Sequence, residues 1–149
     1  MSTILEYDTD LLPPSEKHVV VVLEDDPGTL SALVRLLGHE PYELRATLKP
    51  YEALEWIARR EVSLLVSDYI MSDMSGLDMV ESVKKLAPGT TCVLLTAYAD
   101  RIRLQQRWRS SIRELIEKPW DARTLRNTIR HLLRERELQA GRLSAQEGE

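Results

Sequence analysis

The sequence predicts a doubly wound α/β fold, in which helices cover both faces of a parallel β-sheet. Two observations carry this prediction. Short aliphatic runs alternate five times with segments whose apolar residues recur at helical spacing. The first run, 19–23, is apolar at every position, which is typical of a strand covered on both sides. Strands joined through helices must be parallel, and right-handed crossovers place the helices on both faces.

The predicted elements follow one another from residue 18 onward. The first strand covers 18–23, and Asp26 is the expected N-cap of a helix that starts with Pro27 and ends at Gly38. The later strands are expected near 42–46, 62–67, 91–95 and 112–116, and the later helices near 50–60, 76–86, 99–108 and 121–138. We expect 1–17 to be a flexible leader, 18–135 to form one domain, and 136–149 to be a C-terminal helical extension or tail.

The composition fits one globular domain that resides in the cytoplasm. The chain has 149 residues, of which 43% are hydrophobic, and these can supply a single core. The single cysteine, Cys92, lies in an apolar run and cannot form an intrachain disulfide, which favours a reducing compartment. No apolar stretch approaches the ~20 residues of a membrane span, and the N-terminus does not resemble a signal peptide.

Charge is distributed unevenly along the chain. The net charge is −4, yet residues 101–136 contain 11 Lys and Arg against 4 Asp and Glu. This stretch could attract an acidic partner or nucleic acid, but a solvated helix face is the favoured interpretation. A helix-turn-helix module does not fit in the residues that follow it, so we expect no direct nucleic-acid binding.

Polar side chains stand where the predicted strands end. Glu24 and Asp25 follow the first strand, Asp68 the third, Thr96 the fourth and Lys118 the fifth. In open parallel sheets the ligand crevice lies beyond the carboxyl ends of the strands. The five side chains are therefore expected to meet in one site.

The residue types at these strand ends predict magnesium and phosphate chemistry. Converging carboxylates repel one another unless a cation is present, and oxygen ligands without His or Cys favour Mg²⁺. Lys118 would offer a point charge to a phosphoryl oxygen, and the Thr96 hydroxyl would donate a hydrogen bond to another. Asp68 is then the predicted in-line nucleophile.

The motifs at these positions resemble those of the receiver domains of bacterial response regulators. The resemblance extends over about 18–135, and the Lys-Pro-Trp ending is similar to that of one subgroup. The four motifs are Glu24-Asp25-Asp26-Pro27, Ser67-Asp68-Tyr69-Ile70-Met71 with Gly76, Leu95-Thr96-Ala97-Tyr98 and Glu117-Lys118-Pro119-Trp120. This likeness implies a flavodoxin-like sheet with the strand order 2-1-3-4-5.

The resemblance also implies a role for each residue of the site. Asp68 accepts phosphate from a sensor histidine kinase or a phosphotransfer protein, and the change at Asp68 switches contacts with an output protein. Asp25 ligates Mg²⁺ directly together with Asp68, Glu24 acts chiefly through a water, and the Ile70 carbonyl completes the site. The Lys118–Pro119 bond is expected to be cis. Such a receiver catalyses only its own phosphorylation and dephosphorylation.

Four positions depart from the family pattern or modify it. Leu115 stands where many receivers carry an aromatic residue, so the usual coupling between that residue and the threonine is in doubt. Ser72 replaces a common proline. Ile70 and Tyr98 occupy the positions that flank the attacking water in the family, and their bulk predicts a long-lived aspartyl phosphate.

The surface that receivers commonly use for contacts is also identified by the resemblance. It comprises the predicted helix 99–108, the strand 112–116 and the last helix, and it could support a homodimer or an output contact. The output partner and the kinase are not named by the sequence.

Two other functions remain as alternatives. The chain could be a pseudo-receiver that is never phosphorylated, although such modules lose part of the acidic, acceptor, threonine and lysine set. A magnesium-dependent phosphatase with an aspartyl nucleophile would need a second acid two residues after Asp68, where Ile70 stands instead.

Overall fold

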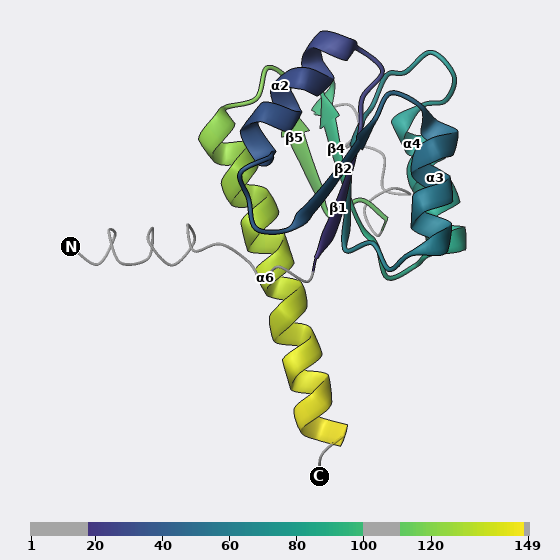
Figure 1. The fold of residues 1–149 in the computed structure, drawn as a ribbon. Coiled ribbons are helices and arrows are strands. Elements are labelled where there is room, and N and C mark those ends of the chain that lie inside the picture. Colours follow the sequence, from purple (N-terminus) through teal and green to yellow (C-terminus); the bar gives the residue numbers. More distant parts are fainter. Residues whose placement is uncertain (1–17, 100–110, 148–149) are drawn as a thin grey trace, which may run out of the picture.

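A computed structural model describes residues 18–99 and 111–147, with side chains up to residue 141. Five parallel strands form one sheet with the order β2-β1-β3-β4-β5, as the sequence and its resemblance predict (Figure 1). The strands are β1 (Val19–Leu23), β2 (Glu43–Thr47), β3 (Leu64–Asp68), β4 (Thr91–Thr96) and β5 (Glu114–Glu117). The expected leader, and the helix expected near 99–108 beyond its first residue, lie outside the described residues.

Helices cover both faces of the sheet, which confirms the doubly wound class (Figure 1). Among the described helices, the first and the last along the chain cover one face of the sheet. The two helices between them in the sequence cover the opposite face. The first pair is α2 (Pro27–Leu37) and α6 (Ala122–Glu147), and the second is α3 (Pro50–Arg59) and α4 (Gly76–Leu86).

The core is divided into two layers by the sheet. In β1, Val19, Val21 and Leu23 join the cluster that contains the buried residues of α3 and α4. Val20 and Val22 join the cluster that contains those of α2 and α6. Successive side chains of a strand point to opposite faces, so a run that is apolar at every position supplies both layers.

Short polar side chains fix the helix starts that lie near the carboxyl edge of the sheet. The Asp26 carboxylate accepts a hydrogen bond from the Thr29 backbone N–H at 2.8 Å, which confirms it as the N-cap of α2. Ser75 caps α4 in the same way, accepting from Asp78 N at 3.1 Å. Each cap satisfies a backbone donor that the first helical turn leaves unpaired.

The last helix is longer than predicted. We expected its end near residue 138, but α6 runs through Gly141 to Glu147, which gives it 26 residues. A helical glycine costs only about 1 kcal/mol relative to alanine, and the neighbouring Arg, Leu, Ala and Gln residues favour helix. The end of α6 projects beyond the sheet (Figure 1).

Polar contacts attach the middle of α6 to the rest of the domain. Glu137 Oε1 accepts a hydrogen bond from His18 Nε2 at 2.9 Å, and His18 stands just before β1. Arg130 Nε donates to both carboxylate oxygens of Glu40, at 2.9 and 3.0 Å. The Arg130 contact lies within the part of the helix that packs in the apolar core, and the Glu137 contact holds the helix beyond Leu133, its last core residue.

Among the described residues, no helix combines the length and the apolar character that crossing a membrane requires.

Candidate functional site

The residues singled out in the sequence gather at the carboxyl edge of the sheet. Asp68 and Thr96 are the last residues of β3 and β4, and Glu24 and Lys118 directly follow β1 and β5. Backbone bonds extend the strand pairing to this edge: Lys118 N donates to Thr96 O at 3.0 Å, and Glu24 N donates to Thr47 O at 3.2 Å. The sheet therefore fixes the backbone from which each side chain projects.

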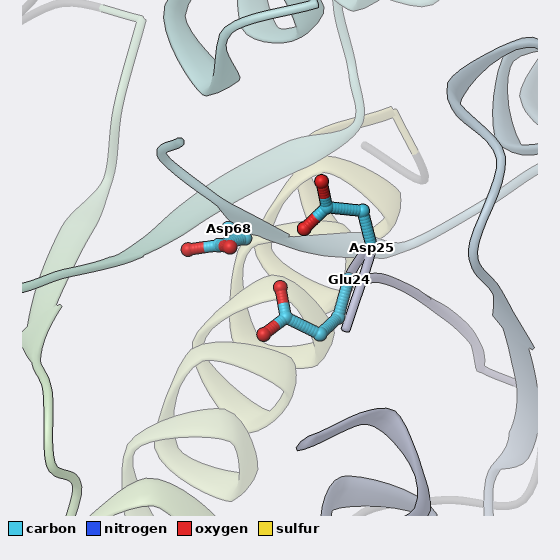
Figure 2. Close-up of side chains that lie close together, drawn as sticks. All are labelled: Glu24, Asp25 and Asp68. Carbon is cyan, nitrogen blue, oxygen red and sulfur yellow. The ribbon is translucent and has the colours of Figure 1, made fainter. Parts of the chain in front are cut away.

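Three carboxylates converge at the centre of this edge (Figure 2). Glu24, Asp25 and Asp68 each present one oxygen, and these atoms lie within 4.8 Å of one another. Glu24 and Asp68 are buried, with 1% and 7% of their surfaces exposed, and Asp25 is half-buried. Such a cluster is costly without a cation, because buried like charges repel one another and lose hydration.

The donor set fits a hard divalent cation such as Mg²⁺. All of the available ligands are oxygens, and the buried Glu24 Oε2 has no hydrogen-bond partner among the described residues. Buried polar atoms normally have a partner, so a buried carboxylate oxygen that lies beside two other acids and has none is suited to hold a cation.

Lys118 partly neutralises the cluster. Its Nζ lies 2.7 Å from Asp68 Oδ1 and donates a hydrogen bond to Glu24 Oε1 at 3.3 Å. Burial lowers the pKa of Lys118, but the hydrogen bonds and charges of Asp68 and Glu24 outweigh burial and raise this pKa above its ordinary value. Lys118 is therefore a fixed positive charge at the mouth of the site, where its side chain is 26% exposed.

One lysine cannot neutralise three carboxylates, and the remaining negative charge affects the pKa of Glu24. The pKa of Glu24 is raised from 4.5 to about 7, chiefly by burial and then by the hydrogen bond and negative charge of Asp68, whereas Lys118 acts in the opposite direction. Without a metal ion, Glu24 therefore holds a proton for about half of the time at neutral pH.

Thr96 lies at the same edge, with its hydroxyl held by the loop that follows β4. Thr96 is 2% exposed, and its Oγ1 accepts a hydrogen bond from the Tyr98 backbone N–H at 2.8 Å. This bond occupies one lone pair and leaves the hydroxyl proton available for donation. Asp68 pairs with Leu95 in the parallel sheet, so Thr96 lies one residue beyond the partner of Asp68 in β4.

The loop after Asp68 is held close to the sheet by a glycine. Gly76 N donates to Tyr69 O at 2.7 Å, and a Cβ at residue 76 would lie 2.5 Å from Asp68 O and 2.8 Å from Tyr69 Cα. Only a residue without a side chain allows this approach. Gly76 thus fixes the path of the loop that carries Ile70, whose side chain is 58% exposed.

The remaining predicted positions lie around this centre. The Tyr98 ring packs edge to face on Tyr69, with ring centroids 6.4 Å apart, and is 41% exposed. Leu115 is half-buried and packs against the core layer that contains α3 and α4. The Lys118–Pro119 peptide bond is cis, as the resemblance implied. Trp120 is partly buried and packs against the other core layer.

One contact of the site was missed in the sequence. The Ser72 backbone N–H donates a hydrogen bond to Asp25 Oδ2 at 2.9 Å, which joins the loops after β1 and β3. A backbone donor is present at every residue except proline, so its sequence signal is weak. The only available cue was that Ser72 stands where the resembling proteins commonly carry proline.

Comparison with known proteins agrees with the motifs and the fold. The model of the response regulator receiver domain matches residues 20–130. An uncharacterized 14.6 kDa protein from the sodA1 3′ region of Leptolyngbya boryana is 34% identical over 104 residues, which are 68% of this chain and 79% of that protein. The DNA-binding transcriptional regulator NtrC of Azospirillum brasilense is 25% identical over 114 residues, which are 76% of this chain but only 24% of NtrC.

Solved structures give the same result. The signal receiver domain of an HD domain-containing protein from Pseudomonas fluorescens Pf-5 superposes with a TM-score of 0.76 at 25% identity, covering 89% of this chain and 98% of that one. A CheY-like response regulator receiver domain protein from Methanospirillum hungatei JF-1 has a TM-score of 0.74 at 26% identity, covering 82% and 98%. The family model spans most of the chain, and the strand order and the acidic cluster agree with it. The chain therefore belongs to the response regulator receiver domain family.

Proposed function

We propose that this receiver accepts a phosphoryl group on Asp68 in a Mg²⁺-dependent reaction and thereby switches contacts with an output protein. The observation that carries this proposal is the convergence of three carboxylates and the Lys118 ammonium at the carboxyl edge of the sheet. Phosphoryl transfer to a carboxylate requires positioning and charge neutralisation more than covalent help from the protein. These residues supply both.

The Asp68 carboxylate is the nucleophile. One of its oxygens forms a bond to phosphorus while the bond from phosphorus to the donor nitrogen of a phosphohistidine breaks, and the imidazole leaves with the electron pair. The sheet holds the Asp68 backbone during this step, and Gly76 holds the following loop against it. Transfer therefore needs little movement of the acceptor.

Lys118 and Thr96 bind the oxygens of the incoming group. The Lys118 ammonium contacts Asp68 at 2.7 Å in the resting site, so a short movement brings it to a phosphoryl oxygen. The Thr96 hydroxyl keeps its bond from Tyr98 N and donates its own proton to a second oxygen. Both groups stabilise charge that is present only after the donor arrives.

Glu24, Asp25, Asp68 and the Ile70 carbonyl are the proposed holders of Mg²⁺. When bound, the ion would neutralise the acids and the phosphoryl oxygens, which is the chemistry that Mg²⁺ supplies in phosphate sites. Glu24 must release its proton for this purpose, and the unpaired Glu24 Oε2 is the atom that gains a partner.

The donor and the receiving partner follow from the same proposal. A sensor histidine kinase or a phosphotransfer protein would supply the phosphoryl group in the cytoplasm, and an unidentified output protein would read it. A homodimer through the helix expected near 99–108, β5 and α6 is a further proposal, and its first element lies outside the described residues. The match covers only 24% of the length of NtrC, so the DNA-binding activity of that longer protein is not part of this proposal.

The test is phosphorylation by a small phosphodonor, followed by intact mass measurement. With acetyl phosphate and Mg²⁺ we expect one added phosphoryl group in the wild type and none after Asp68→Asn. Asp73→Asn is the matched control, because Asp73 is an exposed acid of the same loop. Addition that persists in Asp68→Asn would contradict the choice of acceptor. Failure to label the wild type, also with phosphorylated kinases or phosphotransfer proteins, would favour an interaction module that is never phosphorylated.

A further inference from the structure

The hydrogen bond between Ser72 and Asp25 connects two loops that are far apart in the sequence. Ser72 N donates to Asp25 Oδ2 at 2.9 Å, across a separation of 47 residues. Asp25 belongs to the loop between β1 and α2, and Ser72 belongs to the loop between β3 and α4. Among the described residues, the Ser72 N–H is the donor that binds the Asp25 carboxylate.

The bond holds Asp25 in an orientation that suits a metal ligand. Asp25 is half-buried, and its carboxylate takes part in the cluster of three acids (Figure 2). A side chain at this exposure would otherwise sample several rotamers and turn away from Glu24 and Asp68, because like charges repel. The Ser72 N–H opposes that movement, and it offsets part of the negative charge.

The same bond need not break when a cation binds. A carboxylate has two oxygens and about four lone-pair sites, so Oδ2 can keep the N–H while the other oxygen serves as a ligand. The contact therefore does not compete with the metal. It removes freedom from Asp25 before the metal arrives, and a preorganised ligand loses less entropy on binding.

The loop that carries Ile70 is fixed by the same contact. Tyr69 N donates to Leu95 O at 3.0 Å, and Gly76 N donates to Tyr69 O at 2.7 Å, so both of these bonds tie Tyr69. Ser72 supplies the anchor on the other side of Ile70, and this anchor is the one that reaches the acidic cluster. The backbone between Tyr69 and Ser72 is thus held at both ends.

We propose that the Ser72 backbone N–H is a positioning group that preforms the divalent-cation site, by fixing Asp25 and the loop that carries the Ile70 carbonyl. The proposal rests on the function proposed above, because it takes Asp25 as a metal ligand. It adds a residue that acts only through its backbone, and whose side chain is dispensable.

Two substitutions at the same position separate the backbone from the side chain. Ser72→Ala removes the hydroxyl and keeps the N–H, whereas Ser72→Pro removes the N–H. Immobilising one side chain costs roughly 0.5 to 1.5 kcal/mol, so Ser72→Pro should weaken Mn²⁺ or Mg²⁺ binding about 2- to 12-fold. Ser72→Ala should bind as the wild type does.

The first measurement is metal binding without any phosphodonor. Free Mn²⁺ is followed by electron paramagnetic resonance during a titration of the wild type and both variants. In phosphorylation by acetyl phosphate, Ser72→Pro should need proportionally more Mg²⁺ for half-maximal labelling, with the final extent of labelling unchanged. Equal metal affinity of the alanine and proline variants would overturn the positioning role. Absence of metal binding by the wild type would instead overturn the function proposed above.

A second measurement does not depend on whether the proline variant folds. In the metal-free wild type, the Ser72 amide proton should exchange slowly with solvent, and Asp25→Ala should accelerate this exchange at least about tenfold, since the loss of a bond to a charged acceptor costs roughly 1.5 kcal/mol or more. Amides in β5 serve as the reference for global stability. Exchange at Ser72 that is already fast, or that Asp25→Ala leaves unchanged, would overturn the proposal.

Discussion

The proton on Glu24 predicts that the affinity of the site for a divalent cation rises steeply with pH. Burial and the neighbouring Asp68 raise the pKa of Glu24 from 4.5 to about 7 in the metal-free protein. A cation binds the ionised cluster, so the proton must leave first. The ionised fraction of a group with this pKa is about one tenth at pH 6 and about nine tenths at pH 8, which predicts roughly tenfold tighter binding at pH 8.

The same proton affects the stability of the metal-free protein in the opposite direction. Because the folded-state pKa of Glu24 is raised, its contribution to stability is complete below about pH 4.5 and is lost as the pH rises through about 7. The gap between these values corresponds to about 3 kcal/mol at most. Saturating Mg²⁺ should therefore stabilise the protein more at pH 8 than at pH 6.

Calorimetric titration with Mg²⁺ at pH 6, 7 and 8 measures this effect. Repeating the titration in buffers with different heats of ionisation counts the protons that are released, and we expect about half a proton at pH 7. The control is Glu24→Gln, in which the dependence on pH should largely disappear. Affinity that is constant from pH 6 to 8, or the same slope in Glu24→Gln, would refute the assignment of this proton to Glu24.

Three further substitutions test the surroundings of the site. Gly76→Ala should lower the free energy of unfolding by about 1 to 3 kcal/mol, because the added Cβ would meet backbone atoms at 2.5 and 2.8 Å. The control is Gly89→Ala, whose added Cβ would have nothing within 4 Å and should change this free energy by less than about 0.5 kcal/mol. Chemical denaturation measures both. Arg130→Met should cost about 3 kcal/mol in the same assay, since it leaves the Glu40 carboxylate, whose side chain is 2% exposed, without its guanidinium partner. Adding Glu40→Gln should recover part of this loss, and no recovery would show that the charge is not the cause. Tyr98→Ala should shorten the lifetime of the aspartyl phosphate, because the exposed ring no longer shields the approach of water; an unchanged or longer lifetime of the label would contradict this role.

The place of the site could be predicted from the sequence because it follows from topology. Once the strands are parallel, Glu24, Asp68 and Lys118 must meet at one edge, whatever their distances in the sequence. The cap at Asp26 was predictable for a similar reason, since a short acid followed by proline is a local signal that needs no tertiary contact.

The electrostatic state of the site could not be predicted in this way. The pKa of Glu24 is raised because only 1% of its surface is exposed and because Lys118 lies closer to Asp68 than to Glu24. The Lys118 Nζ atom is 2.7 Å from Asp68 Oδ1 and 3.3 Å from Glu24 Oε1. Both depend on side-chain packing, which a list of strand-end residues does not contain. The bond from Ser72 was missed for a related reason, because the donor is backbone and only the loop path brings it to Asp25.

The last helix shows the limit of local signals. The sequence predicted an end near residue 138, but the helix continues through Gly141 because its neighbours favour helix, and contacts such as that of Glu137 with His18 fix its middle.

The path of α6 gives the domain a rigid extension. Buried side chains from Leu125 to Leu133 pack on the sheet, and Glu137 bonds to His18 beyond them. With a rise of 1.5 Å per residue, the ten residues from Glu137 to Glu147 extend the helix by about 15 Å. A straight helix turns as one body, so a small tilt about its packed segment would move Glu147 further than Glu137. The projecting end would thus enlarge a displacement that is small where the helix packs on the sheet.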